Sequence, residues 1–517
     1  MMNLNNNIEY NAAFDLVHIN SIKNSKKLAF IDDDQMITYS ELYNKVKSFS
    51  YKLLSLGLKK NDKVIICMYD CINFPITFLG SIWSGIVPIC INTMLHKIDL
   101  EYMIQDSEAK AVICSEDLSG LFKEIKEKSD KNLLIVSDKN QSSFPINHDV
   151  IDLSSMINSK LVNSKPEKTY QNSECFWLYS SGSTGKPKGT IHLHKSLKNT
   201  ATLYAKNILK TTQNDIFFSA AKLFFAYGLG NALTFPLSVG GTSILSKQRP
   251  TAEVIIKNIK ENEATIFFGV PTLYAGILNS NFNSEDLKSL RISVSAGEAL
   301  PEHLCKKWKN VVGTNVLDGI GSTEMLHIFI SNSIDLISPG SSGKPVPGYE
   351  VRIIKDDNSF AGINEIGELE VKGPTSAISY WKKPEKTKAT FLGQWTKTGD
   401  KYIKNSDGIY KYCGRADDMM KVSGQYVSPF EIEEALQSHK DVLEVAVVGK
   451  EDKDKLIKPK AFIVLNNNSN NTNLEKELTD YVKKNLTPFK YPRWYEFVTS
   501  LPKTATGKIQ RFKLRRL

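Results

Sequence analysis

Residues 179–189 (YSSGSTGKPKG) combine the residue types that hold a polyphosphate. Glycine lets the main chain approach phosphates closely, and N–H, hydroxyl and ammonium groups satisfy the phosphate oxygens. The segment is not a Walker loop, because the spacing GxxxxGK[ST] does not occur in it. A flexible linker is the alternative, but the apolar run 176–179 (FWLY) directly before it favours a strand. The sequence therefore predicts a phosphate-binding loop that follows a buried strand.

Five further motifs follow this loop in order along the chain. They are 295–299 (SAGEA), 318–324 (DGIGSTE), 398–400 (TGD), 412–424 (YCGRADDMMKVSG) and 502–510 (PKTATGKIQ). Together with the loop, they resemble the motifs of the adenylate-forming superfamily, which includes acyl-CoA synthetases, adenylation domains and firefly luciferase. The resemblance extends over the whole chain. One departure is Ile320, which stands where the family often has an aromatic residue, so packing against adenine would be aliphatic on that side.

The resemblance implies which residues carry adenylation. The catalytic residues would be Lys508, Glu324, Thr184 and Thr323, with Glu324 also holding magnesium. The implied nucleotide contacts, in which Asp400 and Arg415 bind the ribose, are Ser181, Gly182, Ser183, Gly185, Lys186, Lys188, Gly297, Glu298, Ala299, Asp318, Gly319, Asp400 and Arg415. These types suit the reaction, because a carboxylate that attacks the α-phosphate brings two anions together. Cationic and hydroxyl groups, with a metal ion, stabilise the accumulating charge.

The resemblance also implies a second step, in which CoA attacks the adenylate. Lys508 must then leave, and a small C-terminal domain would rotate about a hinge at Asp417. Val422, Ser423 and Gly424 would line the path of the pantetheine arm, where glycine lets a thin ligand pass close to the main chain. We therefore expect ATP, Mg²⁺ and the co-substrate coenzyme A.

Two segments bear on the acid substrate. Residues 222–236 (KLFFAYGLGNALTFP) and 318–332 (DGIGSTEMLHIFISN) are more similar to benzoate–CoA ligases and their hydroxy- or aminobenzoate relatives than to fatty-acid or acetate enzymes. The implied acid pocket consists of Ala226, Tyr227, Gly321, His327 and Ile328, with Lys421 near the carboxylate. Small and flat residues suit a planar ring. The alternatives are that His327 is a hydrogen-bonded core histidine and that Tyr227 only packs.

The elements that must position these motifs alternate between helix and strand. Thr38 with Glu41 forms a capping box for a helix that ends at Gly57. Short apolar strands are predicted at 63–68, 87–91, 111–114 and 133–136. This alternation predicts an α/β fold: a large N-terminal domain of stacked sheets wrapped by helices, plus a small mobile C-terminal α+β domain. The expected ranges are 1–415 for the nucleotide- and acid-binding domain, 416–418 for the hinge and 419–517 for the mobile domain with Lys508.

Composition narrows the class of protein. The chain has 517 residues, a formal charge of +10 and seven scattered cysteines without a CxxC pair. The charge is spread as single lysines, which is typical of a solvated surface and does not indicate a nucleic-acid partner. The start, MMNLNNNIEYNAAF, lacks the basic and apolar regions of a signal peptide. The uncharged run 74–91 contains two prolines and two glycines, so we expect a buried helix, turn and strand rather than a membrane span.

The expected function is thus ATP-dependent ligation of a benzoate-like acid to CoA in the cytoplasm. The partners would be the aromatic acid, ATP and CoA, with no nucleic acid and no membrane, and a homodimer stays open. The alternatives are a short- or medium-chain or alicyclic acyl-CoA synthetase, and an adenylation enzyme that loads a carrier protein. A non-catalytic ATP-binding or basic nucleic-acid-binding protein is disfavoured by Lys508, Glu324 and Asp417 and by the diffuse charge.

Overall fold

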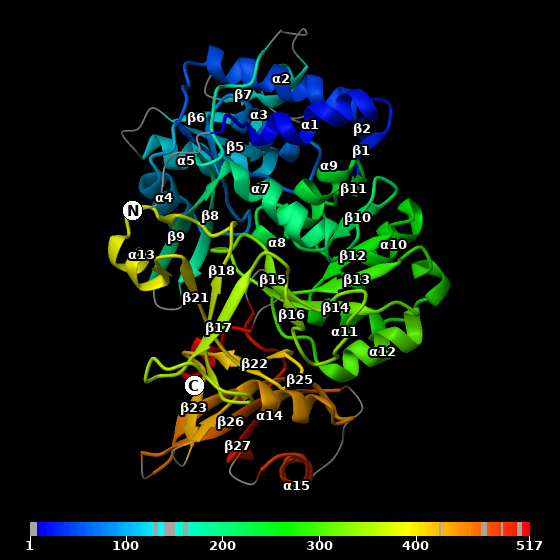
Figure 1. Ribbon diagram of the computed structural model, residues 1–517, viewed down its shortest axis with the longest axis vertical. Coiled ribbons are helices and arrows are strands. Elements are labelled where there is room, and N and C mark those ends of the chain that lie inside the picture. Colours follow the sequence, from blue (N-terminus) through cyan, green and yellow to red (C-terminus); the bar gives the residue numbers. More distant parts are fainter. Residues whose placement is uncertain are drawn as a thin grey trace.

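The chain folds into a large N-terminal body and a small C-terminal body, the orange-to-red part of Figure 1. The computed structural model describes residues 8–128, 133–138, 150–158, 164–182, 185–422, 425–453, 455–466, 473–487, 490–503 and 509–517.

An eight-stranded sheet carries the predicted phosphate loop. In spatial order its strands are β19 (Ser379–Tyr380), β9 (Gly185–Leu193), β8 (Glu174–Gly182), β4 (Val87–Cys90), β3 (Lys63–Cys67), β5 (Ala111–Ser115), β6 (Leu134–Asp138) and β7 (Ile151–Asp152). The strands from β8 to β7 pair in parallel, whereas β9 and β19 are antiparallel additions at one edge. Its inner strands are buried on both faces, as expected of a parallel sheet between layers.

The helical segments of this half include the helix predicted from Thr38 to Gly57. They are α1 (Ala12–Lys23), α2 (Tyr39–Ser55), α3 (Asn73–Trp83), α4 (Lys97–Ser107), η1 (Glu116–Leu118), α5 (Ser119–Glu127) and α6 (Leu153–Ile157). The capping box is confirmed, because the Glu41 N–H donates to Thr38 Oγ1 and the Glu41 carboxylate accepts from the Thr38 N–H at 2.8 Å. The uncharged run is confirmed as helix α3, a turn and strand β4. Among the described helices, none is long and apolar enough to cross a membrane.

A nine-stranded sheet forms the second layer. Its order is β16 (Lys344–Pro345), β15 (Ile328–Ser331), β14 (Val316–Gly321), β13 (Ile292–Ser295), β12 (Ile266–Gly269), β10 (Ile216–Ser219), β11 (Thr242–Ile244), β1 (Leu28–Ile31) and β2 (Met36–Thr38). From β14 to β1 the strands are parallel, so their carboxyl ends meet at one edge. Such an edge is where α/β folds bind ligands.

Helical segments surround this second sheet. They are α7 (His194–Thr200), the π-helix η2 (Ala201–Lys206), α8 (Ala226–Leu229), the π-helix η3 (Gly230–Thr234), α9 (Phe235–Val239), α10 (Ala252–Asn262), α11 (Pro271–Asn279), η4 (Ser284–Leu287) and α12 (Glu302–Val312). Two of them are π-helical, a geometry that is rare and often occurs at functional sites.

A third, antiparallel sheet leads to the C-terminal body. It contains β17 (Glu350–Ile354), β18 (Gly367–Lys372), β21 (Trp395–Lys404), β20 (Phe391–Leu392) and β22 (Tyr410–Arg415), with α13 (Pro384–Thr390) beside it.

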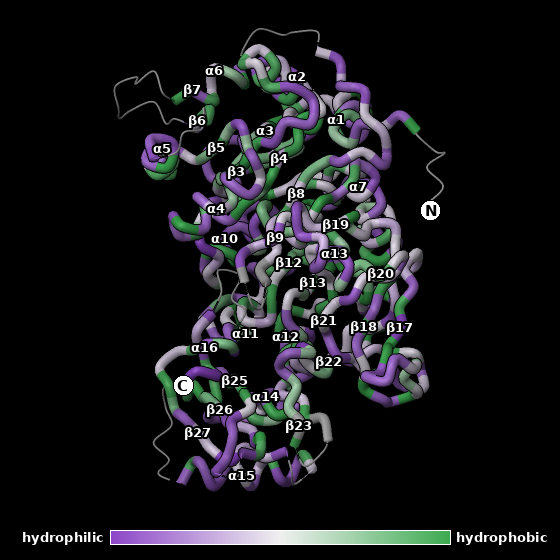
Figure 2. Tube along the Cα trace, turned by 90° about the vertical axis from the view of Figure 1, so that its left-hand side faces the viewer, coloured by the Kyte–Doolittle hydropathy of each residue, from purple (hydrophilic) through white to green (hydrophobic). Residues whose placement is uncertain are grey.

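The C-terminal body has its own small sheet and core. Its elements are β23 (Met420–Val422), β24 (Gln425–Val427), α14 (Pro429–Gln437), β25 (Val442–Glu451), β26 (Ile457–Leu465), α15 (Leu474–Asn485), β27 (Trp494–Phe497) and α16 (Arg511–Leu514). Figure 2 shows the mainly hydrophilic α15 on the outer side of this body. Within the described ranges, the buried apolar clusters divide at 416–418, with four before it and two after it. The predicted fold class is confirmed, while the hinge and the mobility of the small body stay predictions.

Candidate active site

The predicted phosphate loop is the tip of the β8–β9 hairpin. The two strands are antiparallel, and Ser180 lies opposite Lys188. Ser183 and Thr184 lie outside the described residues, as do the side-chain surroundings of Ser181, Gly182 and Gly185. The apolar run 176–179 therefore lies in strand β8, as the sequence predicts.

The two lysines of the loop rest on aromatic rings. The Lys186 Nζ lies 4.9 Å from the centre of the Tyr102 ring, and the Lys188 Nζ lies 4.2 Å from that of Tyr380. Burial lowers the pKa of the Lys188 ammonium, and the nearby Glu324 carboxylate partly opposes this shift. The ring faces attract the cations and hold them at the loop.

Glu324 is fixed by a tyrosine that sequence reasoning missed. The Tyr380 hydroxyl donates to Glu324 Oε1 at 2.7 Å, and the Ala377 N–H donates to the Glu324 main-chain oxygen at 2.7 Å. Burial, followed by the negative charge of Glu324, raises the pKa of the Tyr380 hydroxyl, so Tyr380 stays a neutral donor. Thr323 precedes this carboxylate and its carbonyl accepts from the Leu326 N–H at 3.1 Å. No motif marks Tyr380; it reaches the site because β19 pairs with β9.

The 295–299 loop contacts the C-terminal segment that carries the adenylation lysine. Gly297 has φ +96°, which favours glycine, so the turn before Ala299 depends on this residue. The Glu298 Oε1 accepts from the Ile509 N–H at 3.2 Å, although the residues are 211 positions apart. Lys508 itself lies outside the described residues. Its neighbour Ile509 thus contacts the predicted nucleotide-binding loop at 295–299.

The carboxyl group of Asp318 is buried, with 5% of the residue exposed. Its Oδ2 accepts from the Leu300 N–H at 3.4 Å, whereas its Oδ1 is buried and makes no hydrogen bond of ordinary geometry in the described chain. Burial raises the pKa of this carboxyl well above its usual range. Gly319 follows, where a Cβ would lie 2.9 Å from Ile328 Cγ2. The nucleotide contacts predicted for Asp318 and Gly319 stay predictions. Because the Asp318 carboxyl group is buried, a contact at this residue would involve its main chain.

Asp400 and Arg415, the predicted ribose residues, form an ion pair with each other. They lie opposite each other on β21 and β22, and the Arg415 Nη1 donates to Asp400 Oδ1 at 2.9 Å. The Asp400 charge further raises the pKa of the Arg415 guanidinium. Gly399, at φ +72°, leaves room for the guanidinium, because a Cβ there would lie 2.7 Å from Arg415 Nη2. The structure thus brings together the pair that the sequence assigns to one sugar.

Three of the predicted acid-pocket residues, Tyr227, Gly321 and His327, lie close together in the structure. Tyr227 follows Ala226 in α8, and its hydroxyl donates to the Val294 carbonyl at 3.2 Å. Gly321 and Ile328 are partners between β14 and β15. A Cβ at Gly321 would lie 2.6 Å from the main-chain oxygen of His327, so only glycine fits this turn. The side chain of Ile328 is buried in the core. The side chain of Lys421 lies outside the described part of the chain.

His327 is a buried, neutral histidine inside an aromatic box. Its ring centroid lies 5.2 Å from that of Tyr204, 5.6 Å from that of Tyr227 and 4.6 Å from that of Phe235. Burial lowers the pKa of the imidazole to about 3. The Nε2 atom lies 3.0 Å from the Asn231 Oδ1, a partner that the sequence did not indicate.

The predicted hinge is a tight turn braced from the C-terminus. The Asp418 N–H donates to the Arg415 carbonyl at 3.0 Å, and the Arg515 Nη1 donates to the Asp417 carbonyl at 2.7 Å. On the predicted CoA path, the Val422 side chain is fully buried in the core of the small body. Ser423 and Gly424 lie outside the described residues. Hinge and path remain predictions.

Comparison with known proteins agrees with these motifs. Residues 20–381 match the model of the AMP-binding enzyme family, and 431–508 match the AMP-binding enzyme C-terminal domain. The chain belongs to the AMP-binding enzyme family. The predicted superfamily is thereby confirmed.

Three known proteins are similar to this AMP-binding enzyme over nearly their whole length. A benzoate–CoA ligase of Thauera aromatica is 49% identical over 98% of this chain and 96% of its own length. A crystal structure of a benzoate CoA ligase from Burkholderia xenovorans LB400 has a TM-score of 0.91 and 44% identity, covering 98% of this chain and 100% of that one. An anthranilate CoA ligase, AuaEII, in complex with anthranoyl-AMP has a TM-score of 0.93 and 38% identity, over 98% and 97% of the chains.

Proposed function

We propose that this enzyme activates a benzoate-like aromatic carboxylate with ATP, through an acyl-adenylate, and transfers the acyl group to CoA with release of AMP and pyrophosphate. The observation that carries the proposal is the 49% identity to a benzoate–CoA ligase over nearly the full length of both chains. The local arrangement supports it, because the rings of Tyr227 and His327 lie 5.6 Å apart and Gly321, at the end of β14, packs against the His327 main chain.

The first step is attack of the acid carboxylate on the α-phosphorus, with pyrophosphate as the leaving group. Lys186 and Lys188 reach toward the phosphates from the hairpin, and the hydroxyls of Thr184 and Thr323 add donors. Lys508 would neutralise charge at the reacting phosphate, consistent with the docking of Ile509 on Glu298. Preorganised donors of this kind each contribute about 3–4 kcal/mol in comparable sites.

Mg²⁺ belongs to the proposal as an ion held by Glu324 together with the phosphates. Such ions are commonly bound through one or two protein carboxylates plus substrate oxygens. The Glu324 carboxylate fits this role, because Tyr380 fixes one of its oxygens at the strand end. When bound, the ion would neutralise phosphate charge. Tyr380 then orients the carboxylate, and Lys188 supplies a positive charge beside it.

The second step transfers the acyl group to the CoA sulfur and releases AMP. Ile509 contacts Glu298 in the present conformation, so the small body must move before a thiol takes the place of Lys508. Rotation about Asp417 would provide this movement. The proposal includes a cytoplasmic location, for which the free thiols of all seven cysteines are suited. A homodimer is left to measurement.

The test is a product assay with ATP, Mg²⁺ and CoA over matched acids. We expect AMP and pyrophosphate, with benzoate and anthranilate above cyclohexanecarboxylate, hexanoate and octanoate in kcat/KM. ADP as the nucleotide product would overturn the mechanism. A higher kcat/KM for hexanoate would overturn the aromatic substrate but keep the ligase. Pyrophosphate exchange with benzoate but no thioester from CoA would instead indicate an enzyme that loads a carrier protein.

A further inference from the structure

Asp106 lies in the last turn of α4, beside the hairpin that carries the predicted phosphate loop. Figure 1 shows α4 next to β9, the second limb of this hairpin. The side chain of Asp106 is buried, with 8% exposed. A carboxylate in the last turn of a helix lies at the negative end of the helix dipole and destabilises the helix. The stability of α4 therefore gives no reason for an acid at this position.

Two tyrosine hydroxyls are partners of the Asp106 carboxylate. Tyr179 lies in β8, directly before the loop, and its hydroxyl donates to Asp106 Oδ2 at 2.8 Å. The Tyr102 hydroxyl lies 3.1 Å from Asp106 Oδ1 and 3.2 Å from the Pro187 carbonyl oxygen in β9. Both atoms are acceptors, so the one hydrogen of Tyr102 is shared between them. Asp106 thus connects α4 to the first limb of the hairpin directly and to the second limb through Tyr102.

Tyr102 also supports one of the two lysines of the loop. The Lys186 Nζ lies 4.9 Å from the centre of the Tyr102 ring. Burial, followed by the charge of Asp106, raises the pKa of the Tyr102 hydroxyl, and the same two causes raise the pKa of Tyr179. Both tyrosines therefore stay neutral donors. The ammonium group of Lys383 lies 3.5 Å from Asp106 Oδ1 and adds a cationic partner.

The main chain of Asp106 is held as well. The Trp381 Nε1 donates to the Asp106 carbonyl at 2.8 Å, and the Trp381 N–H donates to the Gly189 carbonyl of β9 at 2.8 Å. Trp381 directly follows Tyr380, whose hydroxyl donates to Glu324. The end of α4 and the hairpin are therefore fixed to each other by the main chain of Asp106 and by its carboxylate.

We propose that Asp106 is a positioning residue for adenylation: through Tyr102 and Tyr179 it holds both limbs of the hairpin, so that the lysines of the loop reach the polyphosphate of ATP. The carboxylate acts through these tyrosines and not by contact with ATP. The reaction is that of the proposed function, on which this inference rests. The contacts that carry it do not depend on which acid is activated.

The two half-reactions separate this role from a general loss of structure. ATP brings a polyphosphate to the loop, whereas a preformed acyl-adenylate has already lost its pyrophosphate. A displacement of about 1 Å in positioned groups can cost about 10²-fold in rate. A displaced hairpin should therefore impair adenylation and leave the transfer of the acyl group from the adenylate to CoA unchanged.

The experiment uses the full-length enzyme, with pyrophosphate exchange for the first step and benzoyl-adenylate plus CoA for the second. Asp106→Ala removes both acceptor oxygens, whereas Asp106→Asn keeps one oxygen that can accept from a tyrosine. Tyr179→Phe and Tyr102→Phe each remove one hydroxyl, and the second keeps the ring beneath Lys186. Unfolding midpoints show whether each variant is folded.

A matched control is another tyrosine–carboxylate hydrogen bond of the same half of the molecule. Tyr69 follows β3, and its hydroxyl donates to Asp117 Oδ2 in η1 at 2.8 Å, the same distance as between Tyr179 and Asp106. Tyr69→Phe therefore removes a bond of the same chemistry and length that links β3 to η1 rather than to the hairpin. If Asp106→Ala does not fold, the difference between Tyr179→Phe and Tyr69→Phe tests the positioning role in its place.

For Asp106→Ala we expect the apparent kcat/KM for ATP in pyrophosphate exchange to fall about 10- to 100-fold. The KM for benzoate and the rate of the thioester step should stay within about twofold of wild type. Asp106→Asn should regain part of the loss, and Tyr179→Phe and Tyr102→Phe should each lose about 3- to 10-fold. Tyr179→Phe combined with Asp106→Ala should lose no more than Asp106→Ala alone, because the acceptor is already absent.

Equal losses in the two half-reactions would make Asp106 a residue of the framework and overturn the positioning role. A wild-type kcat/KM for ATP in Asp106→Ala would overturn it too, as would a loss in Tyr69→Phe as large as that in Tyr179→Phe. A wild-type enzyme that forms no adenylate from any aromatic acid would overturn the proposed function instead. The same variants, compared with the acid that the enzyme does activate, would then still decide the role of Asp106.

Discussion

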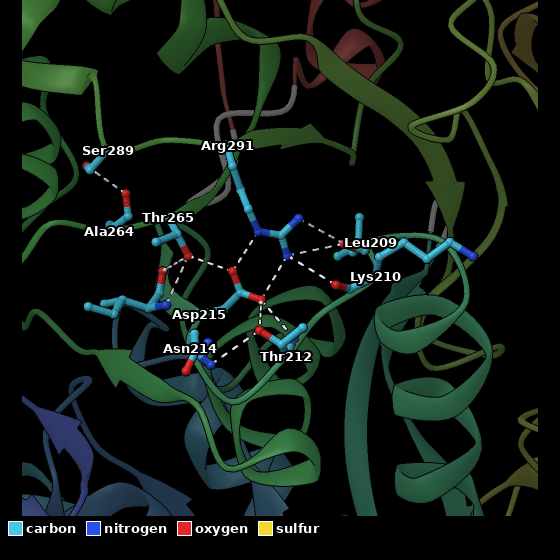
Figure 3. Close-up of polar contacts among 10 residues, drawn as sticks. Leu209, Lys210, Thr212, Asn214, Asp215, Ala264, Thr265, Ser289 and Arg291 are labelled. Atoms are coloured by element: carbon cyan, nitrogen blue, oxygen red, sulfur yellow. Dashed lines mark hydrogen bonds and ion pairs between the residues drawn. The ribbon is translucent and has the colours of Figure 1, made fainter.

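Asp215 and Asp318 are both buried carboxyl groups of the nine-stranded sheet, but they lie at opposite ends of its parallel strands. Asp215 directly precedes β10 and is held in the network shown in Figure 3. The Arg291 Nε and Nη2 donate to its two oxygens at 2.6 and 2.8 Å, and the Thr265 hydroxyl and the Thr212 N–H also donate to it. Burial alone would raise the pKa of Asp215, but these donors outweigh it and the pKa is lowered.

Asp318 lies near the carboxyl ends of the strands, and its pKa is shifted in the opposite direction. Within the described ranges it forms no ion pair, and burial raises its pKa although the Leu300 N–H and the Ser295 side chain partly oppose this shift. At the amino end of the strands, the Asp215–Arg291 ion pair is fully hydrogen-bonded and stabilises the fold. The carboxyl end has a buried acid without an ion-pair partner, Asp318, beside the predicted nucleotide and acid sites. Perturbed groups without a structural partner are typical of functional sites, whereas paired ones are typical of the framework.

The largest expected effect is the loss of activity on changing Glu324, which lies near the carboxyl ends of the parallel strands. Glu324→Gln removes the charge that would hold Mg²⁺ and should reduce pyrophosphate exchange by about 10²–10³-fold. The free energy of unfolding should change by less than about 1 kcal/mol, because the side chain is not part of the core. Tyr380→Phe is the matched control: it keeps the carboxylate and loses one hydrogen bond, so a loss of about 3- to 10-fold is expected. Equal losses in the two variants would contradict the separate roles of the carboxylate and its support.

The second-largest effect is expected for Asp215, at the amino ends of the parallel strands, and should reduce stability rather than activity. Asp215→Ala leaves Arg291 without its partner and should lower the free energy of unfolding by about 3 kcal/mol. This is the low end for a buried pair, because the Arg291 side chain is 35% exposed. In urea titrations, Lys257→Ala, which breaks an exposed pair, should change stability by less than about 0.5 kcal/mol.

Two further measurements sharpen the result for Asp215. The folded-state pKa of Asp215 is lowered, so its stabilisation is present above the unfolded pKa and is lost as the pH falls through the folded value. The gap between wild type and Asp215→Asn should therefore close in acid. At neutral pH, kcat/KM of folded Asp215→Ala should equal that of wild type. A lower kcat/KM in folded Asp215→Ala would mean that Asp215 acts in the active site, which would contradict its assignment to the framework.

The smallest effect concerns Asp318. The folded-state pKa of Asp318 is raised, so its contribution to stability is complete below the unfolded pKa and declines as the pH rises toward the folded value. Asp318→Asn stays neutral at every pH. It should therefore become more stable than wild type by about 1 kcal/mol or more between pH 5 and 8, measured by urea unfolding. A difference that does not change with pH would mean that Asp318 is ionised in the folded protein.

The sequence by itself determined the local elements and the chemistry of the loops. Thr38 with Glu41 marks the start of α2, and the uncharged run 74–91 is the predicted helix, turn and strand, because caps and apolar periods act over a few residues. The phosphate loop, the 295–299 loop and the ribose contacts Asp400 and Arg415 are also predicted from motifs, since each motif needs particular residue types at short spacing. The ion pair between Asp400 and Arg415 was seen only in the structure.

Only the tertiary structure decided which distant side chains support those motifs. Tyr380 reaches Glu324 through the pairing of β19 with β9, Asn231 reaches His327 through a π-helical turn, and Ile509 reaches Glu298 across 211 residues. The opposite states of Asp215 and Asp318 likewise depend on burial and on Arg291, which follows 76 positions after Asp215. Contacts of this kind have no period or spacing in the sequence, because they depend on how the sheets are ordered and packed.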